Sequence, residues 1–497
     1  MIKHAIFLIA LLVFSKSLTS QQFDFNQDSR EAYQHIIALR FEKGKAILTE
    51  EIKNHPDNLL TITLENYIDF FKVFISEDEL LFEKLEVNKS IRLLELQKQP
   101  IDSPYYLWSQ ATINIQWAFA RLKFGEYYTA AFELRRSFIQ LEENERKYPG
   151  FLPNKLLLGL LHALVGSIPD DYQWIVKLTS MNGSVNQGIE EMKEVLIQCK
   201  TTNDFSYLQA EALFFLGFAE LNLLAEPDDL QLLLSSLQSV DSTNLLLVYL
   251  KATIEMRTGN NDAAFVTLLH RPTGEEYYPF FYLSYLEAET MFRKLDMKAD
   301  SYYRNFIISF HGKNYRQDAI RKLAWIGLLE GDTLAYKNWM TQIPKQPSGQ
   351  VEADKQAVIE ANRLVKPDVN LLKSRLLFDG GYYHEASQVL SKFECTTNQS
   401  EAVILEYYYR KGRVFHAMKS YDNALVNYQE VIAFGRNAPF YFAANAALKS
   451  GEIYEVKGEI QKAIESYKLC LSMKPDEYRS GIHQKAKAGI NRLTEGK

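Results

Sequence analysis

Two stretches near the C-terminal end of the chain share one spacing of small and large residues, 39 positions apart. In each stretch a glycine is followed by an alanine after 12 residues and by a tyrosine after 16 residues; these are Gly412, Ala424 and Tyr428, then Gly451, Ala463 and Tyr467. Two antiparallel helices approach closely only where small side chains meet, so this spacing predicts a recurring helical hairpin. We expect the glycine of the first helix to meet the alanine of the second, with large residues filling the gaps.

The same spacing recurs at four earlier alanines, which are Ala130, Ala264, Ala299 and Ala386. Twelve residues before the six alanines stand Ala118, Ala252, Glu287, Ser374, Gly412 and Gly451. All of these except Glu287 are small. Four residues after them, all six are large: Leu134, Leu268, Tyr303, Leu390, Tyr428 and Tyr467. Five residues before the six alanines stand Gly125, Gly259, Lys294, Gly381, Lys419 and Gly458. Four of these six residues are glycines, which predict a turn between the two helices.

The second stretch closes with Lys474, Pro475 and Asp476. With this proline the pattern resembles the tetratricopeptide repeat, which implies a solenoid of stacked helical hairpins. The chain has only 23 glycines and 14 prolines in 497 residues, and this scarcity also favours long helices. Counting weaker copies in the intervals, we predict an all-α protein, a right-handed α-solenoid of about ten to eleven antiparallel helical hairpins. Neighbouring alanines lie 35 to 39 residues apart, which predicts longer second helices or loops than the usual ~34-residue repeat.

A second, local resemblance covers about forty residues around a glycine-rich stretch. Its residues are Leu157-Leu158-Gly159-Leu160, Gly166-Ser167-Ile168-Pro169 and Met181-Asn182-Gly183, followed by Gly188-Ile189. This stretch is similar to part of the eukaryotic tetratricopeptide family that contains the mitochondrial outer-membrane inclusion-clearance protein. The resemblance implies the solenoid fold alone, because a mitochondrial location disagrees with the N-terminal segment.

The first twenty residues have the pattern of a secretory signal peptide. A basic start at Lys3 precedes ten apolar residues, 5–14, and a small polar stretch, 15–20. Ten apolar residues are too few to cross ~30 Å of hydrocarbon, so we expect cleavage between Ser17 and Gln21 and no transmembrane segment in the mature chain. The first cysteine is Cys199, so we expect no lipoprotein. These features predict an exported bacterial protein, periplasmic or associated with the cell envelope.

Breaker residues suggest how the mature chain is divided. Residues 341–350 contain two prolines and a glycine, and we predict a joint at 344–350. It would separate an N-terminal helical array, 21–343, from a C-terminal array, 351–497, that ends in a capping helix near 481–493. A second break at Pro149 and Pro153 begins an irregular insert at about 149–188 in the N-terminal array.

Charge and motifs argue against several classes of activity. The formal net charge is −6, and the one basic concentration is in the last helix, so we expect no nucleic-acid partner. The chain has no CxxC, HExxH, GxGxxG or GxxxxGK[ST] motif. We therefore expect no catalytic residues, no bound metal and no cofactor. The three scattered cysteines, Cys199, Cys395 and Cys470, are expected to be small buried residues.

Aromatic residues are numerous, with 29 tyrosines, 30 phenylalanines and 5 tryptophans. Their densest runs are 277–282 and 407–409, and we expect most of them to fill the core because consecutive helix residues point in different directions. If the solenoid has a binding groove, the first helix of each hairpin should line it. Tyr408, Arg413 and Lys449 are the candidate groove residues.

The predicted function is a non-enzymatic exported scaffold that binds a protein or peptide along its superhelical surface. The alternative is a carbohydrate-binding or small-ligand-binding module of an envelope uptake system, suggested by the aromatic residues and the insert after Pro149. The oligomeric state is left open by the sequence.

Overall fold

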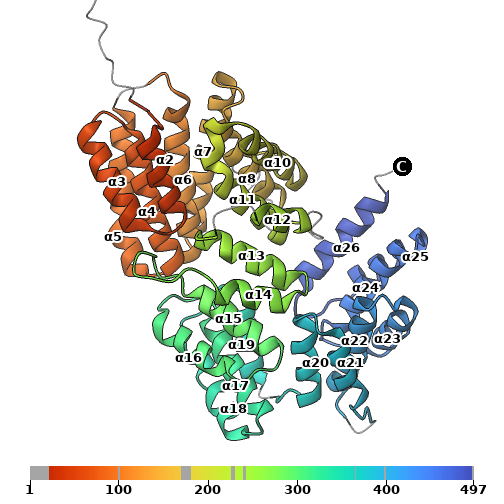
Figure 1. Ribbon diagram of the computed structural model, residues 1–497. Helices are drawn as coiled ribbons and strands as arrows, with labels where there is room; N and C mark the ends of the chain where they lie inside the picture. The colour runs from red at the N-terminus through yellow and green to blue at the C-terminus, as the bar shows by residue number, and fades with distance from the viewer. Residues whose placement is uncertain are drawn as a thin grey trace, which may run out of the picture.

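The computed structural model describes residues 22–98, 101–168, 181–224, 230–238, 242–363, 365–396 and 399–494. Within these ranges the chain forms α-helices and two short 3-10 helices, η2 (Asn203–Leu208) and η3 (Ile343–Lys345), and it contains no strand (Figure 1). The predicted signal peptide, residues 1–20, lies outside the described residues.

Consecutive helices of the N-terminal two thirds pair as hairpins. The pairs are α2 (Gln27–Ile37) with α3 (Phe41–Asn54), α4 (Leu60–Ser76) with α5 (Glu79–Gln97), α6 (Pro104–Phe124) with α7 (Tyr127–Lys147), α8 (Leu152–Gly166) with α10 (Val185–Thr201), α11 (Gln209–Asn222) with α12 (Leu230–Leu237), α13 (Leu245–Arg257) with α14 (Asn261–Leu269), α15 (Tyr282–Arg293) with α16 (Ala299–Ser309), and α17 (Arg316–Leu329) with α18 (Thr333–Met340).

Three further hairpins follow the single helix α19 (Glu352–Arg363). They are α20 (Val369–Asp379) with α21 (Tyr383–Ser391), α22 (Glu401–Ala417) with α23 (Tyr421–Gly435), and α24 (Phe442–Val456) with α25 (Ile460–Ser472). The last helix, α26 (Arg479–Thr494), packs on both helices of the final hairpin. The described chain is thus a stack of eleven helical hairpins, which confirms the predicted all-α solenoid.

The register predicted from the six alanines is confirmed. All six side chains are completely buried; they are Ala130, Ala264, Ala299, Ala386, Ala424 and Ala463. The predicted turn position has a left-handed backbone in five of the six hairpins, at Gly125, Gly259, Gly381, Lys419 and Gly458. In the sixth, Leu295 rather than Lys294 takes this conformation, with φ 63°. Glycine favours the turn because it has no Cβ to clash in the left-handed region.

A large residue fills the space beside the hairpin glycine. The three atoms nearest to a Cβ placed on Gly412 belong to the Tyr428 ring, the first two at 2.5 Å. The expected approach of Gly412 to Ala424 stays a prediction. In the next hairpin a Cβ on Gly451 would overlap Cε1 of Tyr467. The tyrosine one helical turn beyond the alanine therefore fills the space that the glycine leaves, and both helices can approach closely.

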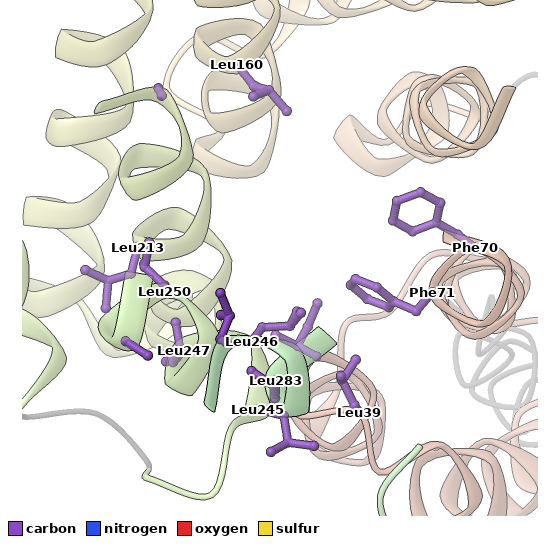
Figure 2. Close-up of a cluster of buried hydrophobic side chains, with 14 of the residues drawn as sticks. Leu39, Phe70, Phe71, Leu160, Leu213, Leu245, Leu246, Leu247, Leu250 and Leu283 are labelled. Carbon is purple, nitrogen blue, oxygen red and sulfur yellow. The ribbon is translucent and has the colours of Figure 1, made fainter. Parts of the chain in front are cut away.

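The N-terminal array packs against itself across its interior. Figure 2 shows Leu39, which follows α2, beside Leu283 of α15, and Phe71 of α4 pointing toward Leu246 of α13. These side chains belong to one continuous core of buried residues that runs from Phe23 to Leu376. The interior of this array is therefore filled by apolar side chains, and the same core continues into Leu372 and Leu376 of α20.

A buried carboxyl group links helices that meet across this interior by hydrogen bonds. Glu211 of α11 accepts hydrogen bonds from the hydroxyls of Tyr33, at 2.7 Å, and Tyr67, at 3.0 Å, on α2 and α4. All three residues are at most 6% exposed. Burial raises the pKa of Glu211 to about 7, although the two tyrosine hydrogen bonds lower it. The first two hairpins are thereby joined to a helix about 140 to 180 residues further along the chain.

A second contact joins the end of α4 to the turn before α17. Glu77 accepts hydrogen bonds from the backbone N–H of Asn314, at 3.0 Å, and from its Nδ2, at 2.9 Å, while Lys123 Nζ lies 2.8 Å from Oε1. Burial alone would raise the pKa of Glu77, but the Lys123 charge and the Asn314 hydrogen bonds outweigh it, so the pKa is lowered. This carboxylate is therefore charged where it bridges distant repeats.

The segment predicted as a joint is hydrogen-bonded to the N-terminal array. Asn314 Oδ1 accepts from the backbone N–H of Gln350 at 2.8 Å, and Gln317 Oε1 accepts from that of Gly349 at 3.2 Å. Tyr127 donates its hydroxyl to Gln350 Oε1 at 2.9 Å. The division of the chain into two arrays at 344–350 stays a prediction.

The glycine contacts give a stability prediction. Gly451→Ala should lower the midpoint of thermal unfolding, because the new methyl group overlaps the Tyr467 ring, at a cost of about 1–3 kcal/mol. Gly481→Ala is the matched control, because no atom lies within 4 Å of a Cβ there, and alanine should stabilise α26 by ~0.5–1 kcal/mol. Circular dichroism during heating measures both; shifts of the same sign would contradict this packing.

The Glu211 carboxyl gives a pH prediction. Its pKa is raised from 4.5 to about 7, so its contribution to stability is complete below pH 4.5 and is lost as the pH rises through 7. The loss amounts to at most about 3 kcal/mol. Thermal melts at several pH values should show a flatter pH dependence for Glu211→Gln than for wild type. Glu42→Gln, an exposed control on α3, should leave the profile unchanged.

Candidate functional site

The first helices of the last three hairpins, α20, α22 and α24, pack side by side. They carry a set of charged and polar residues that we name the inner surface: Arg375, Asp379, Glu406, Arg410, Arg413, Asn445, Lys449 and Glu452. Helix α20 also contacts α15 and α17 of the N-terminal array. In Figure 1, α20, α22 and α24 lie between that array and α25 at the outer edge.

The repeat spacing explains why these residues line up. Arg410 and Lys449 are 39 residues apart, as are the buried alanines Ala424 and Ala463 of their hairpins. Equivalent positions on neighbouring hairpins lie beside each other, so each repeat adds polar groups to the same surface. The hydrogen bond from Asn445 Nδ2 to the Tyr409 hydroxyl, at 2.7 Å, directly joins α24 to α22.

The structure places two of the three predicted groove residues on the inner surface. Arg413 stacks on the Phe378 ring, with its guanidinium carbon 3.9 Å from the ring centroid. Lys449 Nζ lies 2.7 Å from Oε2 of Glu452, one helical turn further on. Tyr408 lies elsewhere: its half-buried ring packs against Tyr407 at 5.3 Å. Burial raises the pKa of Tyr408, and the charges of Cys395 and Glu430 raise it further.

Asp379, at the end of α20, lies within a cluster of arginines. Its carboxylate lies 3.9 Å from Arg375 Nε and 3.7 Å from Arg413 Nη2. Burial alone would raise the pKa of Asp379, but the positive charges of Arg413, Arg375, Arg293 and Arg410 outweigh this effect and lower it. Four guanidinium groups therefore act on one carboxylate at the end of α20, a helix that packs on α15 and α17.

Aromatic rings border this charged cluster. Trp325 of α17 has three cations above its ring, Arg321 at 4.7 Å, Lys322 at 5.1 Å and Arg375 at 5.1 Å. Its indole N–H donates to Glu360 Oε1 at 2.7 Å. Cation–π contacts of this kind orient cationic side chains. The rings of Tyr441 and Tyr478 meet edge to face at 5.0 Å.

Sequence reasoning missed Arg375, Asp379 and Trp325. A signal existed for the first of them, because Arg375 precedes Arg413 by 38 residues, the same spacing as Ala386 and Ala424. Asp379 and Trp325 have no such periodic signal. Trp325 reaches the cluster because α17 packs against α20, the helix that ends at Asp379.

Within the described ranges, no three histidine, cysteine or acidic side chains gather in a way that could hold a metal ion. No described helix combines the length and the apolar character needed to cross a membrane. Cys199 and Cys470 are buried as expected, whereas Cys395 is half-buried. Both dense aromatic runs pack against the hydrophobic cores, as predicted.

The geometry defines a class of protein, an α-solenoid of stacked helical hairpins. Comparison with known proteins adds the family: the tetratricopeptide repeat model matches residues 405–434 and 444–477, which fall on the last two hairpins. The last two hairpins therefore have the sequence pattern of tetratricopeptide repeats, which supports a relationship of the chain to that superfamily. No curated protein matches it. The crystal structure of the yeast Tom70 is similar over 92% of this chain and 96% of that chain, with 12% sequence identity and a TM-score of 0.24.

Proposed function

We propose that this protein is a non-enzymatic scaffold that binds a protein or a peptide along the inner surface of its last three hairpins. The observation that carries the proposal is the match of α22 to α25 to the tetratricopeptide repeat, a module that typically mediates protein interactions. The first helices of these repeats present Arg413, Lys449 and Glu452 with about a fifth to a quarter of each side chain exposed. Such groups can pair with a partner.

The contrast between the two ends of the solenoid supports this location. Apolar side chains such as Leu39, Phe71 and Leu283 fill the interior of the N-terminal array and are buried. The inner surface of the last three hairpins instead carries charged residues that water can reach. A partner could bind there without first displacing part of the chain's own core.

We also propose that the protein acts outside the bacterial cytoplasm, in the periplasm or at the cell envelope. The support is the N-terminal sequence, in which Lys3 precedes ten apolar residues and a small polar stretch.

The scaffold function predicts a protein partner. In-cell crosslinking in the native host, followed by purification of the tagged mature chain and mass spectrometry, should recover a recurrent, near-stoichiometric envelope protein. Lys449→Glu together with Glu452→Lys keeps an ion pair within α24 but exchanges the positions of its two charges, which a partner would contact. Recovery of the partner should fall about tenfold.

The matched control exchanges the exposed pair Glu50 and Lys53 on α3, which has the same three-residue spacing. This exchange should leave recovery of the partner unchanged. Equal recovery with both exchanged chains would contradict binding at the inner surface. Failure to recover any protein, from a chain whose helical circular dichroism is normal, would contradict the scaffold function itself.

The proposed location predicts a processed N-terminus. Mass spectrometry of the protein purified from its host should show a chain that begins between residues 18 and 21, and fractionation should place it outside the cytoplasm. Replacing Leu11 and Leu12 with arginine interrupts the apolar run and should keep the uncleaved chain in the cytoplasm. An intact Met1 on the wild-type protein would refute the assignment.

A further inference from the structure

Helix α5 carries a row of apolar side chains that remain exposed in the described chain. Leu80, Val87, Ile91 and Leu94 are 58–77% exposed, and we name these four residues the α5 stripe. Apart from α7, every other described helix exposes at most two large apolar residues. In Figure 1, α5 lies at the outer edge of the N-terminal array. A concentration of exposed apolar side chains of this kind is typical of an interaction surface.

The other side of α5 is already buried. Phe82, Leu93 and Leu96 belong to the core of the N-terminal array, and the helix packs on α4 and α6. A helix that is apolar on more than one side is typical of a helix that is buried on more than one side. The α5 stripe therefore indicates a second contact, made with another molecule.

The spacing along the α5 stripe is that of a coiled coil. Leu80, Val87 and Leu94 follow one another at intervals of seven residues, and Ile91 lies four residues after Val87. In a regular α-helix these positions cover roughly 60° of the circumference, which is a single narrow seam. This a/d pattern is typical of a helix that packs along its length against one other helix.

Two lysines occupy the remaining positions of the same pattern. Lys84 lies four residues after Leu80, and Lys98 lies four residues after Leu94. A parallel pairing of two copies would place each lysine beside the same lysine of the other copy, and like charges oppose this arrangement. The lysines therefore select against a parallel pair.

An antiparallel pairing places opposite charges together instead. When Val87 of one copy lies beside Ile91 of the other, Lys84 comes within one helical turn of Glu95, and Lys98 comes within one turn of Glu83. The same surface then complements itself, which a two-fold dimer requires.

We propose that two copies of this chain form a two-fold dimer in which their α5 helices pack antiparallel along the α5 stripe. A stable interface usually buries ~1,200–2,000 Å². Helix α7, which is joined to α5 by the ion pair of Glu133 with Lys89, exposes Phe132 and Ile139 and offers further apolar area. In Figure 1, α5 lies far from the last three hairpins, so the dimer would present two inner surfaces.

Sedimentation equilibrium of the mature chain tests the pairing. Wild type should approach twice the mass of one chain as its concentration rises. Val87→Glu together with Ile91→Glu places four carboxylates in the seam of the dimer and should weaken dimerisation at least about tenfold. The helical circular dichroism should not change, because both side chains are exposed. A monomeric wild type, or equal dimer affinity in the double variant, would overturn the inference.

The matched control is Val266→Glu together with Leu269→Glu, which also replaces two exposed apolar residues of one helix, α14. It should dimerise like wild type, and an equal loss of dimer would refute the assignment to α5. Wild type that stays monomeric while its α5 stripe binds a different protein or a phospholipid vesicle would also refute a second copy as the occupant.

A crosslinking experiment tests the orientation of the two helices. In the antiparallel pair, the Cα atoms of Ser90 in the two copies are offset by about 3 Å along the helix axis, whereas those of Glu83 are offset by about 18 Å. Ser90→Cys should therefore be joined across the dimer by a short bis-maleimide reagent, and Glu83→Cys should not. Both variants also carry Cys395→Ser, which removes the half-buried native thiol. Crosslinking at both positions would indicate a parallel pair and contradict the proposed dimer.

Discussion

The close approach of two helices over a small residue is the constraint on which this structure depends. In every hairpin of the alanine register, a fully buried methyl group sits where the second helix crosses the first. In the last two, the absence of a Cβ at Gly412 and Gly451 makes room for a tyrosine ring. The left-handed turn between the helices fixes the angle at which they return. Because this unit repeats, any side chain placed at one position of the first helix recurs on the neighbouring hairpin.

The first helices of the hairpins carry different side chains in the N-terminal array and in the last three hairpins. In the N-terminal array the first helices bear apolar residues toward the interior, where they pack on one another and on Glu211. In the last three hairpins the equivalent helices bear arginine, lysine and carboxylate groups. Arg375, Arg413 and Lys449 keep about a quarter to a third of their side chains exposed, whereas the charged pair Asp318 and Arg321 on α17 is buried.

The parts of the fold that could be predicted from sequence are those that repeat. The buried alanines and the left-handed turn residues follow from local spacing, and even Lys419 keeps the turn conformation without being a glycine. The contact of Gly412 with Tyr428 was missed because spacing alone does not tell which large residue fills a gap. The pairing of Tyr33 and Tyr67 with Glu211 has no periodic signal, because it joins residues about 140 to 180 positions apart. Arg413 and Lys449 were candidates because they lie on the first helices of their hairpins, and their role in binding stays a prediction, whereas no pattern in the sequence marked Asp379.

The hydrogen bonds of Glu77 with Asn314 have a consequence for how the solenoid holds together. An open stack of repeats behaves as a linear lattice, in which end units can detach one at a time. Here the second hairpin is fastened to the turn before α17, 237 residues later, so the intervening repeats form a closed loop. Detaching the first hairpins then requires breaking contacts at both ends of that loop together. The N-terminal array should therefore open as one cooperative unit, while the last hairpins, outside the loop, can fray and adapt separately.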